Sequence, residues 1–146
     1  MASVDRFEDL VAWQLSEELK EEVFKFTARD KVRCDAGFCD DIRRSACSAP
    51  ANIAEGFGYY TPKQNARYVT IARGSLAETL NHVLHAAKRQ YIDDSERNAL
   101  LSLNRRALGA TGNYLRYLKS CKAPPPARSE PTNGATNRRT REPENP

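Results

Sequence analysis

The sequence lacks any apolar run near the roughly 20 residues that a membrane-spanning helix needs, and no signal peptide opens it. We therefore expect a cytoplasmic protein that makes no contact with a membrane. Cysteine is scarce, at four residues in 146. In the cytoplasm, Cys34, Cys39, Cys47 and Cys121 are expected to be reduced thiols rather than a disulfide framework.

Common catalytic and nucleotide-binding motifs are also missing. Ser48 has no adjacent His and Asp arrangement, and no Gly-x-Ser-x-Gly turn occurs. The glycines at positions 56 and 58 lack the preceding strand and the following Lys-Ser/Thr of a phosphate-binding loop. The recognised RNA- and DNA-binding modules are absent as well. We expect a protein that is not an enzyme and that needs no cofactor.

The two histidines give the only candidate metal site. Glu78, His82 and His85 share one face of a predicted helix, and Glu55 is a possible fourth ligand. Di-iron bundles need two Glu-x-x-His motifs, which this chain does not have. Cys34 and Cys39 do not have zinc-finger spacing. We therefore expect no bound metal.

Apolar residues recur at helical spacing through most of the chain, and they predict four helices over residues 8–27, 38–55, 62–91 and 93–120. The predicted fold is an all-α, antiparallel up-down four-helix bundle formed by residues 1–121. Residues 122–146 contain six of the eight prolines and end near a basic Arg-Arg-Thr-Arg run. Because they have almost no large apolar side chain to bury, we expect a disordered tail, which is a candidate for loose RNA or partner binding.

Local signals predict how the helices begin and end. Gly56 is expected to end the second helix in a left-handed conformation. Thr61 is expected to cap the third helix, and Asp93 with Glu96 forms the capping-box pair of the fourth. Pro50 is expected to kink the second helix without ending it, and residues 27–37 are expected to be an ordinary connection. Gly74, in mid-helix, predicts close backbone packing there.

Three segments carry a family resemblance: Phe-Glu-Asp-Leu-Val-Ala-Trp-Gln at 7–14, Asn-Ile-Ala-Glu-Gly at 52–56 and Ala-Arg-Gly-Ser-Leu-Ala-Glu at 72–78. Over roughly residues 7–120 the chain resembles the bacterial 23S rRNA intervening sequence proteins. The resemblance implies a four-helix bundle that assembles into a homopentamer, akin to accessory proteins of diversity-generating retroelements. It implies no known reaction. Thr79 and Arg89 depart from the family pattern, which usually has Leu at both positions.

Charge is divided unevenly along the chain. Residues 1–41 contain six Lys or Arg against eleven Asp or Glu, whereas residues 42–121 contain twelve against five. The two parts can complement one another within or between subunits, which is the interpretation we favour, or the basic part can face nucleic acid. The candidate nucleic-acid-binding residues on the predicted helices are Arg43, Arg67, Arg73, Lys88, Arg89, Arg97, Arg105 and Arg106.

Polar residues also follow helical spacing on the second and third helices. We expect a buried structural network in which Arg44 pairs with Glu78 and Asn52 bonds to backbone that Pro50 frees. The members of this expected network are Arg44, Ser48, Asn52, Glu55 and Glu78.

Aromatic residues Phe57, Tyr59 and Tyr60 cluster at the turn between these helices, beside Lys63 and Arg67. They either stack unpaired bases or close the end of the bundle, and we favour the second role.

Taken together, these patterns and the family resemblance predict a non-enzymatic, homo-oligomeric helical scaffold that binds RNA, DNA or a ribonucleoprotein through a basic surface. The resemblance implies that the oligomer is a pentamer. The alternative is a protein-interaction adaptor that holds a partner with its acidic first helix. Salt dependence separates the two, because phosphate contacts weaken steeply as salt rises.

Overall fold

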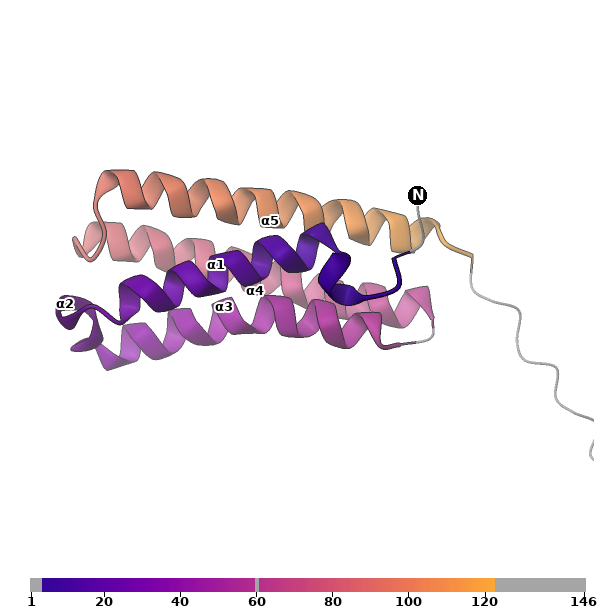
Figure 1. The fold of residues 1–146 in the computed structure, drawn as a ribbon, viewed down its shortest axis with the longest axis horizontal. Helices are drawn as coiled ribbons and strands as arrows, with labels where there is room; N and C mark the ends of the chain where they lie inside the picture. Colours follow the sequence, from indigo (N-terminus) through magenta and orange to yellow (C-terminus); the bar gives the residue numbers. More distant parts are fainter. Residues whose placement is uncertain (1–3, 60, 123–146) are drawn as a thin grey trace, which may run out of the picture.

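The computed structural model describes residues 4–59 and 61–122 (Figure 1). These residues are entirely helical and contain no strand, so the all-α prediction is confirmed for the described part of the chain. Of the tail predicted for residues 122–146, all but Lys122 lies outside the described residues. The elements are η1 (Phe7–Asp9), α1 (Val11–Thr27), α2 (Asp30–Arg33), α3 (Ala36–Phe57), α4 (Pro62–Lys88) and α5 (Asp94–Ser120).

The four long helices lie side by side, and consecutive ones run in opposite directions (Figure 1). α1 packs against α3 and α5, and α4 packs against the same two helices from the other side. None of the described helices is long and apolar enough to cross a membrane. Because every helix has two neighbours, the apolar face of each is buried in a shared core. The largest apolar side chains that are fully buried there are Leu19, Val23, Val32, Ile42, Ile53, Val69, Leu76 and Val83.

The connection between α1 and α3 is more ordered than the sequence predicts. It contains the short helix α2, and α3 begins at Ala36 instead of residue 38. The reason is Asp35, whose carboxylate accepts a hydrogen bond from the Phe38 amide at 3.2 Å and so caps α3. Tyr91 and Arg89 donate to the same carboxylate at 2.8 and 2.6 Å. The Tyr91 hydroxyl and the Phe38 amide hold the pKa of Asp35 below its usual value.

The turn between α4 and α5 starts earlier than predicted, since α4 ends at Lys88 and not near residue 91. Gln90 has a left-handed φ of 58°. This conformation lets the amides of Gln90 and Tyr91 bond the carbonyls of Ala87 and Ala86, at 3.0 and 2.9 Å, which ends the helix in a Schellman motif. α5 then begins with the predicted capping box.

That capping box is complete. The Asp93 carboxylate accepts from the Glu96 amide at 2.8 Å, and the Glu96 carboxylate accepts from the Asp93 amide at 2.9 Å. Thr61 likewise accepts from the Gln64 amide at 3.3 Å and caps α4. Both predicted caps are therefore confirmed.

The predicted roles of two glycines are wrong. Gly56 lies inside α3 and no described glycine has a positive φ. A Cβ atom on Gly56 would lie 2.8 Å from Asn65 Oδ1 and 2.9 Å from Tyr68 Cβ, so this glycine allows α3 and α4 to approach closely. Gly74, where the sequence predicts such packing, has no neighbouring atom within 4 Å of an added Cβ.

Small polar side chains continue the α3–α4 seam along its length. The Ser75 hydroxyl donates to Ser48 Oγ at 2.8 Å, and the buried Thr79 hydroxyl donates to Ser45 Oγ at 2.9 Å. Pro50 lies inside α3, and the helix continues past it as predicted, ending at Phe57 and not at residue 55. The seam thus combines short side chains with hydroxyl groups that are hydrogen-bonded, which permits a close approach there. Beside Gly56, the buried Asn65 Oδ1 has no hydrogen-bond partner.

We expect Gly56→Ala and Gly74→Ala to change stability in opposite directions. The first forces a methyl group against α4 and should lower the free energy of unfolding by about 1–3 kcal/mol. The second removes a flexible residue from an open helix surface and should raise it by about 0.5–1 kcal/mol. Urea unfolding followed by circular dichroism measures both. A stabilising Gly56→Ala change would contradict the close approach.

Candidate nucleic-acid interface

α5 carries charge of one sign over almost its whole length. After Glu96, residues 97–122 include no Asp or Glu. The cations of this segment are Arg97, Arg105, Arg106, Arg116, Lys119 and Lys122.

Three surface hollows follow α5 from one end of the molecule to the other, and none has a carboxylate in its lining. The first lies along α5 itself, the second between the middle of α4 and α5, and the third between the first turns of α4 and the last turns of α5. The cations that line these hollows, here called the basic track, are Lys63, Arg73, Arg105, Arg106, Arg116 and Lys119.

The positive charge of the basic track is not neutralised by the described residues. Within residues 4–59 and 61–122, none of its six cations forms an ion pair. Arg116 donates only to the neutral amide oxygen of Asn113. Gly109 and Gly112 line the second hollow, where nothing lies within 4 Å of an added Cβ on either residue. An anionic chain can therefore approach the helix backbone between Arg73 and Arg116.

Two of the eight candidate cations from the sequence are occupied by structural contacts across helices. Arg43 Nε donates to Thr27 Oγ1 at 2.8 Å, and its guanidinium lies 5.0 Å from the centroid of the Phe24 ring. Arg89 pairs with Asp35, as described for the α3 cap. These two side chains position α1, α3 and α4 relative to one another.

The other candidates differ among themselves. Arg97 pairs with Asp94 at 3.2 Å on the first turns of α5. Arg67 and Lys88 are exposed on α4 and form no ion pair with a described residue. The structure thus brings three candidates together in the basic track, namely Arg73, Arg105 and Arg106.

Sequence reasoning missed Arg116 and Lys119 and considered Lys63 only as part of the aromatic turn. One available signal was the complete lack of carboxylates over residues 97–122, which the overall charge count hides. The position of Lys63 opposite Lys119 depends on helix packing, and no local pattern predicts it.

The expected polar network is only partly assembled, and its charged pair is not buried. Arg44 donates to Glu78 at 2.9 Å, but these side chains are 64% and 40% exposed. Asn52 donates to the carbonyl and hydroxyl oxygens of Ser48 at 2.8 and 3.0 Å, not to the Ala46 carbonyl that lacks a partner amide at Pro50.

Glu55 lies apart from that network, against the tyrosine pair at the α3–α4 turn. The Tyr59 and Tyr68 rings stack with centroids 5.0 Å apart and an angle of 16°. Their hydroxyl oxygens are 3.0 Å apart. The Tyr59 hydroxyl, followed by burial and Glu55, raises the pKa of Tyr68 to about 12. Phe57 packs into the apolar cluster at this end, while Tyr60 lies outside the described residues.

The two histidines, His82 and His85, lie one turn apart on α4. His82 Nε2 lies 3.8 Å from Glu78 Oε1 and has no hydrogen-bond partner. The described residues contain no group of three or more His, Cys, Asp or Glu placed to hold a metal ion. All four cysteines are free thiols.

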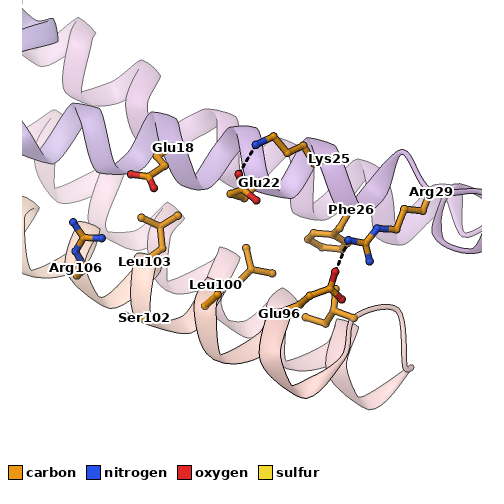
Figure 2. Close-up of a pocket in the computed structure, with 12 residues that line it drawn as sticks. Glu18, Glu22, Lys25, Phe26, Arg29, Glu96, Leu100, Ser102, Leu103 and Arg106 are labelled. Atoms are coloured by element: carbon orange, nitrogen blue, oxygen red, sulfur yellow. Dashed lines mark hydrogen bonds and ion pairs between the residues drawn. The ribbon is translucent and has the colours of Figure 1, made fainter.

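A groove of about 420 Å³ runs between α1 and α5 and differs from the basic track in its charge. Its floor is apolar, formed by Phe26, Leu100 and Leu103 with their neighbours. Figure 2 shows Glu18 of α1 and Arg106 of α5 on opposite sides of this groove. Carboxylates on the α1 side make it a poor surface for phosphate, and its apolar floor suits a protein segment.

The groove is closed at one end by an ion pair between Arg29 and Glu96 (Figure 2). The Arg29 guanidinium and then the Asp93 amide hold the pKa of Glu96 below its usual value. This pair joins the end of α1 to the first turn of α5.

Comparison with known proteins assigns the chain to a family. The family of 23S rRNA-intervening sequence proteins matches residues 8–109. The chain belongs to this family. The match covers the described helices from η1 to the middle of α5, including the α3–α4 seam and much of the basic track.

A solved structure shares the fold of this chain. The chain is similar to a protein with unknown function from the S23 ribosomal protein family of Bacteroides thetaiotaomicron, with 19% identity and a TM-score of 0.62. The similarity covers 75% of this chain and 100% of that one. At this identity it shows a shared fold alone. No curated protein matches the chain.

The two kinds of arginine should differ in what they contribute to stability. Replacing Arg43 by Gln removes a hydrogen bond and a contact with an aromatic ring, and should lower the free energy of unfolding by about 1 kcal/mol. Replacing Arg105 by Gln removes no internal partner and should change it by less than about 0.5 kcal/mol. Thermal and urea unfolding of the two variants check this difference. Equal losses would show that Arg105 has a structural contact.

Proposed function

We propose that this family member is a non-enzymatic scaffold that binds RNA or DNA through the basic track. We further propose that its helices form an antiparallel up-down four-helix bundle, and that it assembles into a ring-like homopentamer. The observation that carries the proposal is the basic track itself, in which six cations line three hollows without a carboxylate or an ion pair. Free cations in this arrangement are available to phosphate at no cost in broken ion pairs.

The dimensions of the track suit a phosphate backbone. Arg105 and Lys119 are 14 positions apart on one helix, which is about 21 Å along its axis. Duplex DNA carries one charge per about 1.7 Å of axis, so several phosphates lie within that length. Contacts to phosphate hold a nucleic acid in place without reading bases, and we therefore expect little sequence preference.

Assembly would use charges and apolar groups that the single subunit leaves exposed. Glu18 and Glu21 lie on α1, and the basic track lies on α4 and α5. Val11 and Ile71, at 59% and 46% exposure, are large apolar side chains open to solvent. A ring would bury such groups and would repeat the track in every subunit, which concentrates a modest charge into a strong local field.

The alternative function is a protein-interaction adaptor, and the α1–α5 groove is the feature that favours it. Its apolar floor and the carboxylates of Glu18 and Glu22 would accept an amphipathic segment with basic residues. Binding of this kind depends on apolar contact and changes less with salt than phosphate binding does.

The assembly should be visible as mass. Light scattering coupled to size exclusion is expected to give five times the 16.4 kDa chain mass at micromolar concentration. A clean monomer at that concentration would refute the oligomer. A mass of another whole multiple would change the proposed number of subunits.

Nucleic-acid binding should depend on salt and on the track. Fluorescence anisotropy at ~50 mM salt should detect binding of unrelated RNA and DNA sequences, and affinity should fall linearly on a log–log plot as salt rises. Replacing Arg105 and Arg106 together by Gln should weaken the binding of all RNA and DNA sequences to a similar extent. It should also reduce the slope of log affinity against log salt by roughly one unit per lost contact.

Arg33→Gln provides a control outside the track, because Arg33 is an exposed cation on α2 that pairs with Asp30 at 3.1 Å. Its affinity and salt slope should equal those of the wild type. If the folded wild-type oligomer binds neither RNA nor DNA at ~50 mM salt, the proposed function is wrong.

A further inference from the structure

The groove between α1 and α5 has one unpaired charge on each of its sides. Glu18 of α1 and Arg106 of α5 line it, and neither forms an ion pair with a residue that the structure describes. They lie on opposite sides of the groove (Figure 2). The other charged residues of the lining are paired with one another, Lys25 with Glu22 and Arg29 with Glu96. A ligand that fits the groove must therefore offer a cation to one side and an anion to the other.

Between these two charges the groove is apolar. Phe26, Leu100 and Leu103 line this part of it. The aliphatic stem of a long charged side chain can cover such a surface while its charged end stays at the rim. The ligand thus needs charges of both signs on long side chains more than it needs large apolar residues.

The sequence that follows the described residues has this order of charges. The run at 138–144 reads Arg-Arg-Thr-Arg-Glu-Pro-Glu. In an extended chain, successive side chains point to opposite sides. Arg139 and Arg141 would then lie on one side of such a segment. Glu142 and Glu144 would lie on the other, so the run offers both of the charges that the groove lacks.

The chain is long enough to bring this run to the groove. Arg106 and Lys122 are 16 positions apart, which is about 24 Å along α5. Arg138 follows Lys122 by another 16 residues, and the r.m.s. end-to-end distance of a flexible segment of that length is about 20–24 Å. A linker whose r.m.s. length matches the span gives the highest effective concentration, in the millimolar range for short flexible linkers. Weak ion pairs are therefore enough to hold the run in the groove.

We propose that residues 138–144 dock in the α1–α5 groove of their own chain, with their arginines against Glu18 and their glutamates against Arg106. Other surfaces fit this segment less well. The basic track would repel the arginines, because its three hollows have no carboxylate in their lining. On the α3–α4 face, Arg44 and Glu78 already pair with each other at 2.9 Å. Docking would also neutralise Arg106 and so remove one free cation from the basic track.

Trypsin cleavage of the full chain tests the docking, because a docked arginine is protected from the protease. Glu18→Gln should raise the initial rate of cleavage after Arg138 and Arg139 about two- to fivefold, the range for loss of one exposed ion pair. Raising the salt to ~0.5 M should have a similar effect on the wild type, because salt screens such a pair. Peptide mass spectrometry measures the rates.

Cleavage after Arg128 is the internal control. Arg128 follows Lys122 by six residues, which span at most about 22 Å and fall short of Arg106. Each rate is therefore divided by the rate after Arg128. Glu21→Gln is the matched control variant, since Glu21 is an exposed carboxylate of α1 that does not line the groove. Equal ratios in the wild type and Glu18→Gln, or an equal rise in Glu21→Gln, would overturn the proposal.

A zero-length crosslink locates the segment independently. Residues 123–146 contain no lysine, so Arg139→Lys introduces a single amine there without changing the charge. A water-soluble carbodiimide, which joins amines to carboxylates, should link position 139 to Glu18 or Glu22 in the full chain. Arg128→Lys is the matched control and should give no link to either glutamate.

Three results of the crosslinking would overturn the proposal. Links from position 139 to carboxylates all over the molecule would show that the segment has no preferred site. Links between Glu18 and Lys63 or Lys119 of another copy would show that the groove is a subunit interface. In a mixture of chains grown with ordinary and heavy nitrogen, links between a light and a heavy chain would place the segment on a neighbouring subunit.

Discussion

The close contact between α3 and α4 is the constraint on which the rest of the structure depends. Gly56 leaves no room for a side chain against Asn65 and Tyr68, and the paired hydroxyls of Ser45 and Thr79 continue the contact further along. Because α4 is fixed against α3, α5 packs in the remaining space on the other side of α4. The α3–α4 contact therefore determines where the hollows between α4 and α5 lie, together with the cations around them.

The charged side chains of this molecule differ in whether another side chain neutralises or holds them, and the difference follows their position on the helices. Arginines at the junctions of helices, such as Arg43 and Arg89, are held by side chains of neighbouring elements and by aromatic rings. Those on the solvent side of α5, such as Arg105, form no ion pair with any residue that the structure describes. Acidic residues of α1 are in part neutralised within their own helix, as Lys20 pairs with Glu17. Arginine therefore has a structural role at the helix junctions, whereas on the solvent side of α5 its guanidinium is available to bind an anion.

Sequence reasoning succeeded where the determinant is local. The capping box of Asp93 and Glu96 and the cap at Thr61 depend on side chains that bond their own turn, so a few neighbouring letters suffice. It failed for Gly56, because a glycine needed for close packing resembles a glycine needed for left-handed backbone until the distance to the next helix is known. It also could not separate Arg43 from Arg105, since the difference is a contact with another element.

The two ends of the molecule differ in the number of side-chain contacts that join one helix to another. At the end that contains α2, four side-chain contacts tie the α1–α3 connection to the α4–α5 region: Arg29 to Glu96, Lys31 to the Gln90 carbonyl, and Arg89 and Tyr91 to Asp35. Local opening is costlier where several such links must break together. The opposite end, with the third hollow, has fewer cross-links of this kind among the described residues. We therefore expect the last turn of α5, which lies at that end, to open locally more often than its first turn, which the Arg29–Glu96 pair holds.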